Sequence, residues 1–122
     1  MIKLNFTTRC LGAKAAQRLK DKQVIQTIRS EKSDIVQALT DRTLKLGDTI
    51  EVLLDGEQIG MATCLNIDPV KWHNLDIADA QRGGFDNRFE LASALKRAGY
   101  RFKDMEEYFF WRCLLSWSRE GE

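Results

Sequence analysis

Thr27 and Arg29 are two polar residues whose types and spacing could support binding chemistry. They stand two positions apart in a segment that we predict to be a strand, so their side chains share one face. An arginine on an inward face needs a partner. That partner is either a structural carboxylate, such as that of Glu51 or Asp48, or a phosphate or base edge on a ligand. Thr27 alone would indicate only the β-propensity of threonine.

Positive charge is concentrated near the beginning of the chain. Residues 1–32 hold eight Lys or Arg against two Asp or Glu, although the net charge of the whole chain is only +1. Lys14, Arg18 and Lys22 recur every four residues, so they predict one cationic stripe on a helix. Such a stripe suits a phosphate backbone. The alternative is a solvated helix face that pairs with acids elsewhere in the fold.

Three other side chains could contact a ligand. Trp72 and Tyr108 could stack on bases, although aromatic residues near strand ends more often belong to the core. Arg112 either lines a cleft or pairs with an acid. The sequence leaves these alternatives open.

Cysteine and histidine give little support for metal or nucleophile chemistry. Cys10, Cys64 and Cys113 are widely spaced, and none of them forms the C-x-x-C pair of a zinc or redox site. His73 is the only histidine, and no nucleophile lies beside it in the sequence. We therefore expect free thiols, no metal and no cofactor.

The length and composition of the chain are typical of one ordered domain. It has 122 residues, of which 43% are hydrophobic and 30% charged, with one proline. We predict a single domain over residues 1–122. No run approaches the roughly 20 apolar residues of a membrane span, and the strand-like N-terminus differs from a signal peptide. We expect a cytoplasmic protein without a membrane partner.

Hydrophobic periodicity predicts strands connected by short helices. The expected strands are residues 2–6, 24–29, 49–54, 57–67 and 107–117, and the expected helices are 10–22, 34–39 after an N-cap at Ser33, 75–81 and 88–98. Asp55-Gly56 predicts a tight hairpin. So many strands in a small chain favour a closed or nearly closed barrel, which removes exposed edges. The predicted class is α+β, a small β-barrel with short helices on the connections.

Several short motifs follow one another in a characteristic order. They are Thr27-Ile28-Arg29, Leu44-Lys45-Leu46-Gly47-Asp48-Thr49-Ile50, Gly60, Gly84-Phe85, Glu90-Leu91 and Tyr108-Phe109. In this order and spacing the chain resembles the ASCH domain family over nearly its whole length. The resemblance implies a PUA-like β-barrel with a cleft beside it, and a role in binding RNA or a nucleotide.

The resemblance also implies a possible enzyme. Some ASCH proteins are amidohydrolases that remove the acetyl group from N4-acetylcytidine. They use a lysine three residues before the threonine of Thr-Ile-Arg, that threonine, and a glutamate near Gly-Phe. In this chain Thr27 matches the threonine, whereas Val24 and Gly83 occupy the lysine and glutamate positions.

The residues and the resemblance together predict a domain that binds RNA or a modified nucleoside without catalysis. The binding residues would be Lys14, Arg18, Lys22, Thr27 and Arg29. One alternative is the amidohydrolase, in which a register shift brings Lys22 to Thr27 and an aspartate, Asp79 or Asp86, supplies the acid. Ribonuclease activity is also associated with the family, but this sequence has no histidine pair or carboxylate cluster to support it. The third alternative is a regulatory module that binds a protein or a small ligand.

Overall fold

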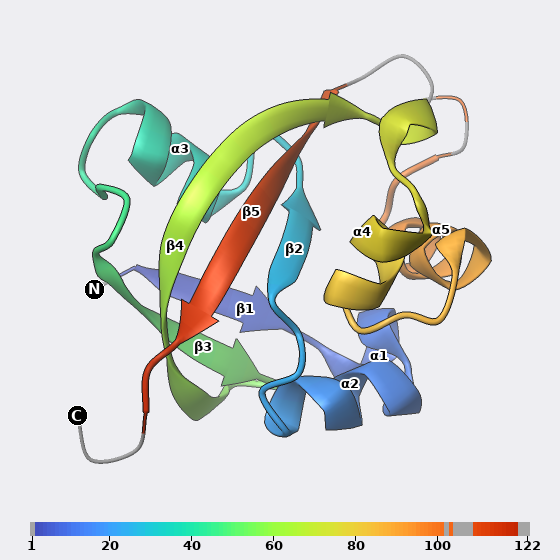
Figure 1. The fold of residues 1–122 in the computed structure, drawn as a ribbon, viewed down its shortest axis with the longest axis horizontal. Helices are drawn as coiled ribbons and strands as arrows, with labels where there is room; N and C mark the ends of the chain where they lie inside the picture. The colour runs from blue at the N-terminus through green and yellow to red at the C-terminus, as the bar shows by residue number, and fades with distance from the viewer. Residues whose placement is uncertain (1, 102, 104–108, 120–122) are drawn as a thin grey trace.

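One five-stranded sheet organises the part of the chain that the computed structural model describes, residues 2–101, 103 and 109–119 (Figure 1). Its strands are β1 (Lys3–Phe6), β2 (Gln26–Arg29), β3 (Thr49–Leu54), β4 (Glu57–Lys71) and β5 (Phe109–Trp117). They lie in the order β1-β3-β4-β5-β2, with β1 parallel to β3 and the other neighbours antiparallel. The sheet curls strongly into a half-barrel (Figure 1). The predicted α+β class with a curved sheet is confirmed.

The half-barrel remains open between its two outer strands. Among the described residues, β1 pairs only with β3 and β2 pairs only with β5, so both have a free edge. The barrel closure expected from the sequence is therefore only partial.

Two local features shape the long β3–β4–β5 ribbon. Asp55 and Gly56 have φ angles of 51° and 87°, as a tight hairpin turn requires, and the predicted hairpin is confirmed. In β4, Cys64 pairs with Leu115 and Asn66 with Leu114, which leaves the residue between them as a bulge. A bulge bends its strand and increases the local twist, and it accounts for part of the curl.

Short helices pack around the half-barrel. They are α1 (Thr8–Leu11), α2 (Ala13–Lys20), α3 (Asp34–Thr40), the 3-10 turn η1 (Trp72–Asn74), α4 (Ile77–Arg82) and α5 (Arg88–Arg97). The helices α1, α2, α4 and α5 gather on the β2 side, and α3 lies on the other (Figure 1). In the described part of the chain, no helix has the length and hydrophobicity needed to cross a membrane.

The predicted helix over residues 10–22 is wrong in its continuity. Gly12 has a φ of 86° and separates α1 from α2, and α2 ends at Lys20. Lys22 follows with a φ of 60°, in the left-handed region. The cationic stripe therefore ends with the helix, before it reaches Lys22.

Other predicted boundaries differ by a few residues. β2 begins at Gln26 instead of residue 24, β4 continues through Pro69 to Lys71 instead of ending at residue 67, and α4 starts at Ile77. Ser33 occupies the predicted N-cap position of α3, but its hydroxyl makes no capping hydrogen bond. Residues 107 and 108 of the predicted last strand lie outside the described residues.

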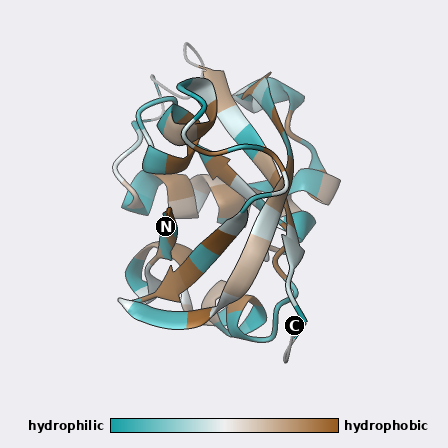
Figure 2. Ribbon diagram, turned by 90° about the vertical axis from the view of Figure 1, so that its left-hand side faces the viewer, coloured by the Kyte–Doolittle hydropathy of each residue, from teal (hydrophilic) through white to brown (hydrophobic). Residues whose placement is uncertain are grey.

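Two clusters of buried hydrophobic side chains hold the elements together. The larger one fills the half-barrel and includes Leu19, Ile50 and Val52. The smaller one packs Phe110 of β5 against Leu91 and its neighbours in α4 and α5. Hydrophobic and hydrophilic residues alternate along the strands (Figure 2), as expected for a sheet with one buried face. Each such fully buried side chain contributes about 1.5–3 kcal/mol.

Candidate binding cavity

A cavity of about 320 Å³ lies between the free edges of β1 and β2. The end of β1, all of β2, Cys10 and Leu11 of α1, and one side of α5 form its walls. Phe85 and Tyr100 add two aromatic rings to the lining, and most of the wall is apolar. The cavity thus lies where a closed barrel would pair β1 with β2, the two outer strands of the sheet.

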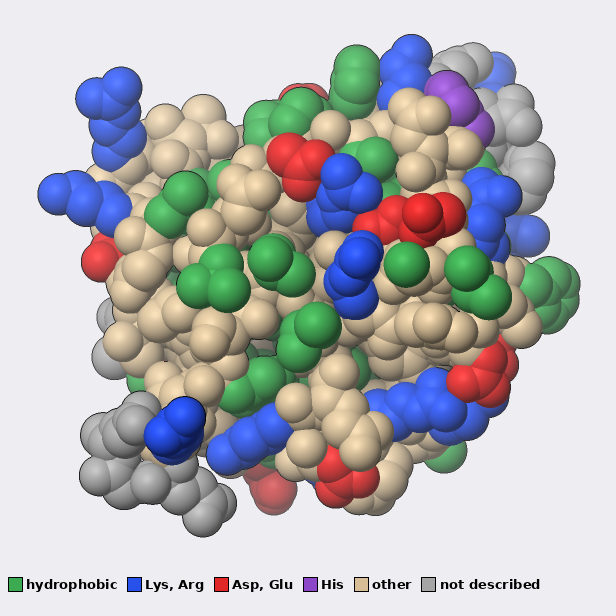
Figure 3. Space-filling view, in the orientation of Figure 1, with side chains coloured by type: hydrophobic (Ala, Val, Ile, Leu, Met, Phe, Trp, Pro, Cys, Tyr) green, Lys and Arg blue, Asp and Glu red, His purple; other side chains and the backbone are tan. Residues whose placement is uncertain are grey.

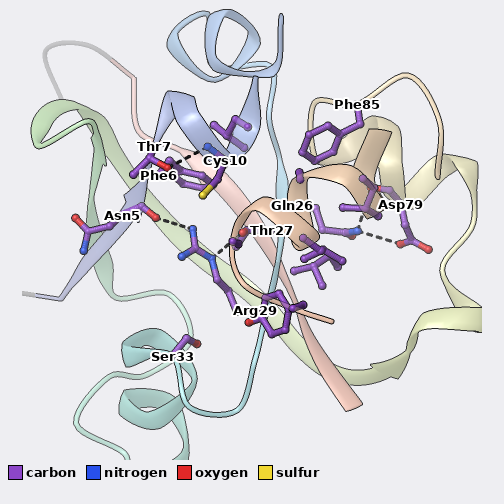
Figure 4. A pocket seen from close by; sticks show the side chains of 18 residues that line it. Asn5, Phe6, Thr7, Cys10, Gln26, Thr27, Arg29, Ser33, Asp79 and Phe85 are labelled. Carbon is purple, nitrogen blue, oxygen red and sulfur yellow. Dashed lines mark hydrogen bonds between the residues drawn. The ribbon is translucent and has the colours of Figure 1, made fainter. Parts of the chain in front are cut away.

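Arg29 spans the gap between the two edges (Figure 4). Its Nε donates to Thr27 Oγ1 at 2.9 Å, and its Nη2 donates to the backbone carbonyl of Asn5 at 2.9 Å. The guanidinium carbon also lies 4.7 Å from the centre of the Phe6 ring, a cation–π contact. One side chain of β2 therefore connects β2 to β1.

The guanidinium of Arg29 has no carboxylate partner among the described residues. The sequence left Glu51, Asp48 and a ligand as possible partners, and the structure gives neutral acceptors instead. Arginine carries five N–H donors, and two of them are used here. Burial lowers the pKa of Arg29 below its usual range, although an arginine stays charged in proteins. The cavity therefore has an uncompensated positive charge and donors to spare.

Two further hydroxyls border the cavity beside this charge. Thr27 is buried, and its oxygen accepts from Arg29, so its O–H proton stays free to donate. Ser33 Oγ is buried and has no hydrogen-bond partner. Both hydroxyls add donor capacity at the same end of the cavity.

A network of charges forms the back wall behind Gln26. The Gln26 amide donates to Asp79 Oδ1 at 3.0 Å (Figure 4). Asp79 also accepts from Arg112 at 3.1 Å and from the backbone N–H of Asp76 at 3.0 Å. Arg112 binds Asp68 through two further hydrogen bonds of 3.1 and 2.7 Å. The structure therefore places Arg112 in an ion pair, not in the cavity lining.

Asp79 is ionised and saturated in this network. Burial alone would raise its pKa, but the hydrogen bonds from Gln26, the Asp76 amide and Arg112 lower it. A carboxylate with a lowered pKa is a poor proton acceptor at neutral pH. Asp79 touches the cavity, but its bonds tie it to the back wall.

Lys14 and Arg18, the two stripe residues on α2, pair with acids from the α4–α5 region. Lys14 binds Asp86 and, at 2.9 Å, Glu90. Arg18 binds Asp86 at 2.8 Å. These hydrogen bonds raise the pKa of Lys14 and lower that of Asp86. On the face shown in Figure 3, basic side chains likewise lie beside acidic ones and form no continuous basic patch.

Lys22 lies on another part of the surface, against β4 and β5. Its Cε is 3.2 Å from the position that a Cβ on Gly60 would occupy, and the ring of Trp117 is 3.0 Å from the same point. Gly60 therefore allows both side chains to approach the strand. Lys22 is not among the residues that line the cavity, so the structure does not bring Lys22 to Thr27.

The predicted stacking residues also lie apart from the cavity lining. Trp72 is in η1, where the guanidinium of Arg88 lies 4.8 Å from the centre of its ring. Tyr108 lies outside the described residues. Of the five predicted binding residues, the structure thus places Thr27 and Arg29 in the cavity and the other three outside its lining.

The thiols differ sharply in exposure. Cys10 borders the cavity and is partly exposed, whereas Cys64 and Cys113 are buried. Within the described residues, no three His, Cys, Asp or Glu side chains gather as a metal site would require.

The sequence did not indicate Asn5, Cys10, Ser33 or Tyr100 as site residues. Asn5 contributes a backbone carbonyl, which is independent of residue type, and Ser33 was interpreted only as an N-cap. Cys10 and Tyr100 lie far from β2 in the sequence and meet it only through the fold. The one usable signal was an inward arginine on a strand. Comparison with known proteins found no family model, no curated protein and no solved structure that matches this chain.

Proposed function

We propose that this chain is a PUA-like domain of the ASCH type that binds RNA or a nucleoside, and that it holds one nucleotide unit in the cavity between β1 and β2 without catalysis. The observation that carries the proposal is the guanidinium of Arg29. It borders the cavity with N–H groups to spare and without a carboxylate partner in the described part of the chain.

The size and lining of the cavity suit a ligand of this kind. Its volume of about 320 Å³ is at the lower end of the range of about 300–1,000 Å³ for small-molecule sites. The apolar wall of α5 and the rings of Phe85 and Tyr100 offer surfaces for a flat base. Arg29 offers a planar fork of donors for a phosphate or a base carbonyl. A longer RNA would insert one nucleotide and leave the rest outside.

The groups around Thr27 support binding more than catalysis. Amide hydrolysis needs a base within hydrogen-bond reach of the nucleophile. The group that contacts the Thr27 hydroxyl is a guanidinium, which donates hydrogen bonds and takes up no proton. Lys22, the proposed substitute base, is outside the cavity lining, and Asp79 is held in its ion-pair network.

Cys10 allows a direct test of occupancy. It is the partly exposed thiol, while Cys64 and Cys113 are 0% exposed. The rate at which a thiol reagent modifies Cys10 can be measured with each of the four nucleoside 5′-monophosphates and with a single-stranded RNA of about 12 nucleotides. We expect at least one of these probes to slow the reaction at saturation.

Two variants control this assay. Cys10→Ser should abolish the signal, which identifies the reacting thiol. Arg29→Lys should raise the probe concentration needed for protection, whereas Arg9→Lys, a change on the exposed surface of α1, should not. If no probe protects Cys10, or if protection is the same in Arg29→Lys, the proposed function is wrong.

A further inference from the structure

β2 presents its edge to the cavity, not one of its faces. All four of its residues, Gln26 to Arg29, line the cavity. Successive side chains of a strand point to opposite faces, so four consecutive residues can line one cavity only where the strand edge borders it. A free strand edge exposes backbone N–H and C=O groups. The cavity wall therefore includes backbone donors and acceptors of β2.

The hydrogen-bond pattern of β2 and β5 identifies which backbone groups face outward. The Leu115 N–H donates to the Ile25 carbonyl at 2.8 Å. In an antiparallel pair, hydrogen-bonded and non-hydrogen-bonded positions alternate. The Ile25 carbonyl and the backbone groups of Thr27 therefore face β5, and Ile28 directs its groups away from β5. The N–H of Ile25, before the start of β2, donates instead to the Arg82 carbonyl at 2.8 Å. Among the described residues, no protein group pairs with the N–H or C=O of Ile28 on that side.

The same logic applies across the cavity. Along β1, the carbonyl of Ile2 accepts from Glu51 of β3 and that of Phe6 accepts from Asp55, directly after β3. The carbonyl of Asn5 therefore faces the gap, where it accepts from Arg29. The backbone of Ile28 has no such internal partner. Its N–H and C=O are adjacent, point the same way in an extended strand, and leave a polar pair at a mostly apolar wall.

We propose that the backbone N–H and C=O of Ile28 form the base-reading element of the cavity. They would pair with a ligand that carries a hydrogen-bond donor beside an acceptor on one planar edge, as the imide edge of uracil and the amide edge of guanine do. A phosphate offers only acceptors, and it would leave the Ile28 carbonyl unpaired, which is costly. The ligand phosphate or a second carbonyl of the base would then accept hydrogen bonds from the free N–H groups of Arg29. This inference rests on the proposed function and adds the orientation of the ligand.

Amide hydrogen exchange of the protein tests this geometry first without a ligand. Thr27, whose N–H bonds to β5, should exchange more slowly than Ile28, whose N–H faces the cavity. Equal protection of the two amides in the free protein would overturn the inference, because Ile28 would then have a partner already.

The ligand arm uses the nucleoside monophosphate that protects Cys10 best. At saturation it should slow the exchange of the Ile28 amide by about tenfold or more, the equivalent of one hydrogen bond of about 1.4 kcal/mol, and leave Thr27 unchanged. As a matched pair, uridine 5′-monophosphate should bind about tenfold more tightly than its 3-methyl analogue, whose imide donor is blocked.

The outcomes separate the two proposals. Protection of Cys10 with unchanged exchange at Ile28 overturns the base-reading role of β2 and leaves nucleotide binding intact. Equal affinity for uridine 5′-monophosphate and its 3-methyl analogue does the same, provided that guanosine 5′-monophosphate and its 1-methyl analogue also bind with equal affinity. Failure of all four monophosphates and of the RNA to protect Cys10 overturns both.

Discussion

Replacement of Arg29 by lysine separates the two roles that the structure gives this side chain. The guanidinium connects β2 to β1 through Thr27 Oγ1 and the Asn5 carbonyl, and it presents its other N–H groups to the cavity. Lysine keeps the charge and most of the length, but its single ammonium cannot reproduce the planar fork. The substitution therefore tests geometry at constant charge.

The expected loss of stability follows from the contacts that lysine cannot make. It can keep one of the two hydrogen bonds, and a hydrogen bond to a charged group contributes about 1.5–3 kcal/mol when well buried. The bond to Asn5 is solvent-exposed, so the lower end of that range applies. The ring contact with Phe6 contributes about 0.5–1 kcal/mol. Because both acceptors are neutral, no unpaired buried carboxylate remains, and we expect a destabilisation of about 1–2 kcal/mol.

The expected loss of affinity is separate and of similar size. A bidentate arginine contact to a base or phosphate contributes about 1–3 kcal/mol, which corresponds to a loss of about 5-fold to 150-fold in affinity. Urea unfolding and titration with the best-binding monophosphate should be measured on one sample, with Arg9→Lys as the control. Unchanged affinity would refute the role in binding. A destabilisation of several kcal/mol would mean that Arg29 has a charged structural partner.

Three other perturbations test the remaining features of the site. Lys14 and Arg18 already pair with Asp86, so changing both to alanine should alter the slope of log affinity for a 12-nucleotide RNA against log salt by less than one unit. Loss of two phosphate contacts would change that slope by about 1.4 units. A change of that size would mean that Lys14 and Arg18 do bind RNA. Asp79→Asn should lower the free energy of unfolding at pH 7 by about 2 kcal/mol. Because folding lowers the pKa of Asp79, its stabilisation is fully present above the ordinary value of about 3.9 and is lost as the pH falls through the lowered pKa of the folded state. The free energies of unfolding of both proteins in urea should therefore approach each other as the pH is lowered below about 3.9, and a constant difference would contradict this. The purified protein should release no acetate from N4-acetylcytidine, and turnover that is lost in Thr27→Val would overturn the non-catalytic proposal.

Local patterns in the sequence predicted much of the secondary structure, because short-range interactions determine it. Asp55-Gly56 gave the correct hairpin, since both residues tolerate the positive φ that the turn needs. The helix break at Gly12 was missed, because a glycine on the apolar face of a helix pattern is also compatible with an unbroken helix. Its φ of 86° makes it the junction of two helices. The early end of α2 at Lys20 was missed as well, and it matters for function, since it removes Lys22 from the surface that Lys14 and Arg18 share.

The partner of Arg29 could not be predicted for a different reason. Alternation along β2 correctly put Thr27 and Arg29 on one face, but the sequence favoured side-chain carboxylates as internal partners. The actual acceptor is the backbone carbonyl of Asn5, 24 positions away, and a backbone group leaves no signal in residue identity. It is available only because β1 pairs in parallel with β3 and has a free edge.

Incomplete closure of the barrel is what creates the candidate site. A closed sheet would pair the backbone of Ile28 and Asn5 with each other or with an added strand. In the half-barrel, the side chain of Arg29 donates to the Asn5 carbonyl, and the backbone of Ile28 stays available to a ligand at the cavity. Free edges are normally a liability that proteins cover. Here α1 and α5 border the gap, so helices partly cover the edge and leave a cavity beside it. The open gap between β1 and β2 therefore explains both the presence of the cavity and the free backbone groups that we propose to bind a base.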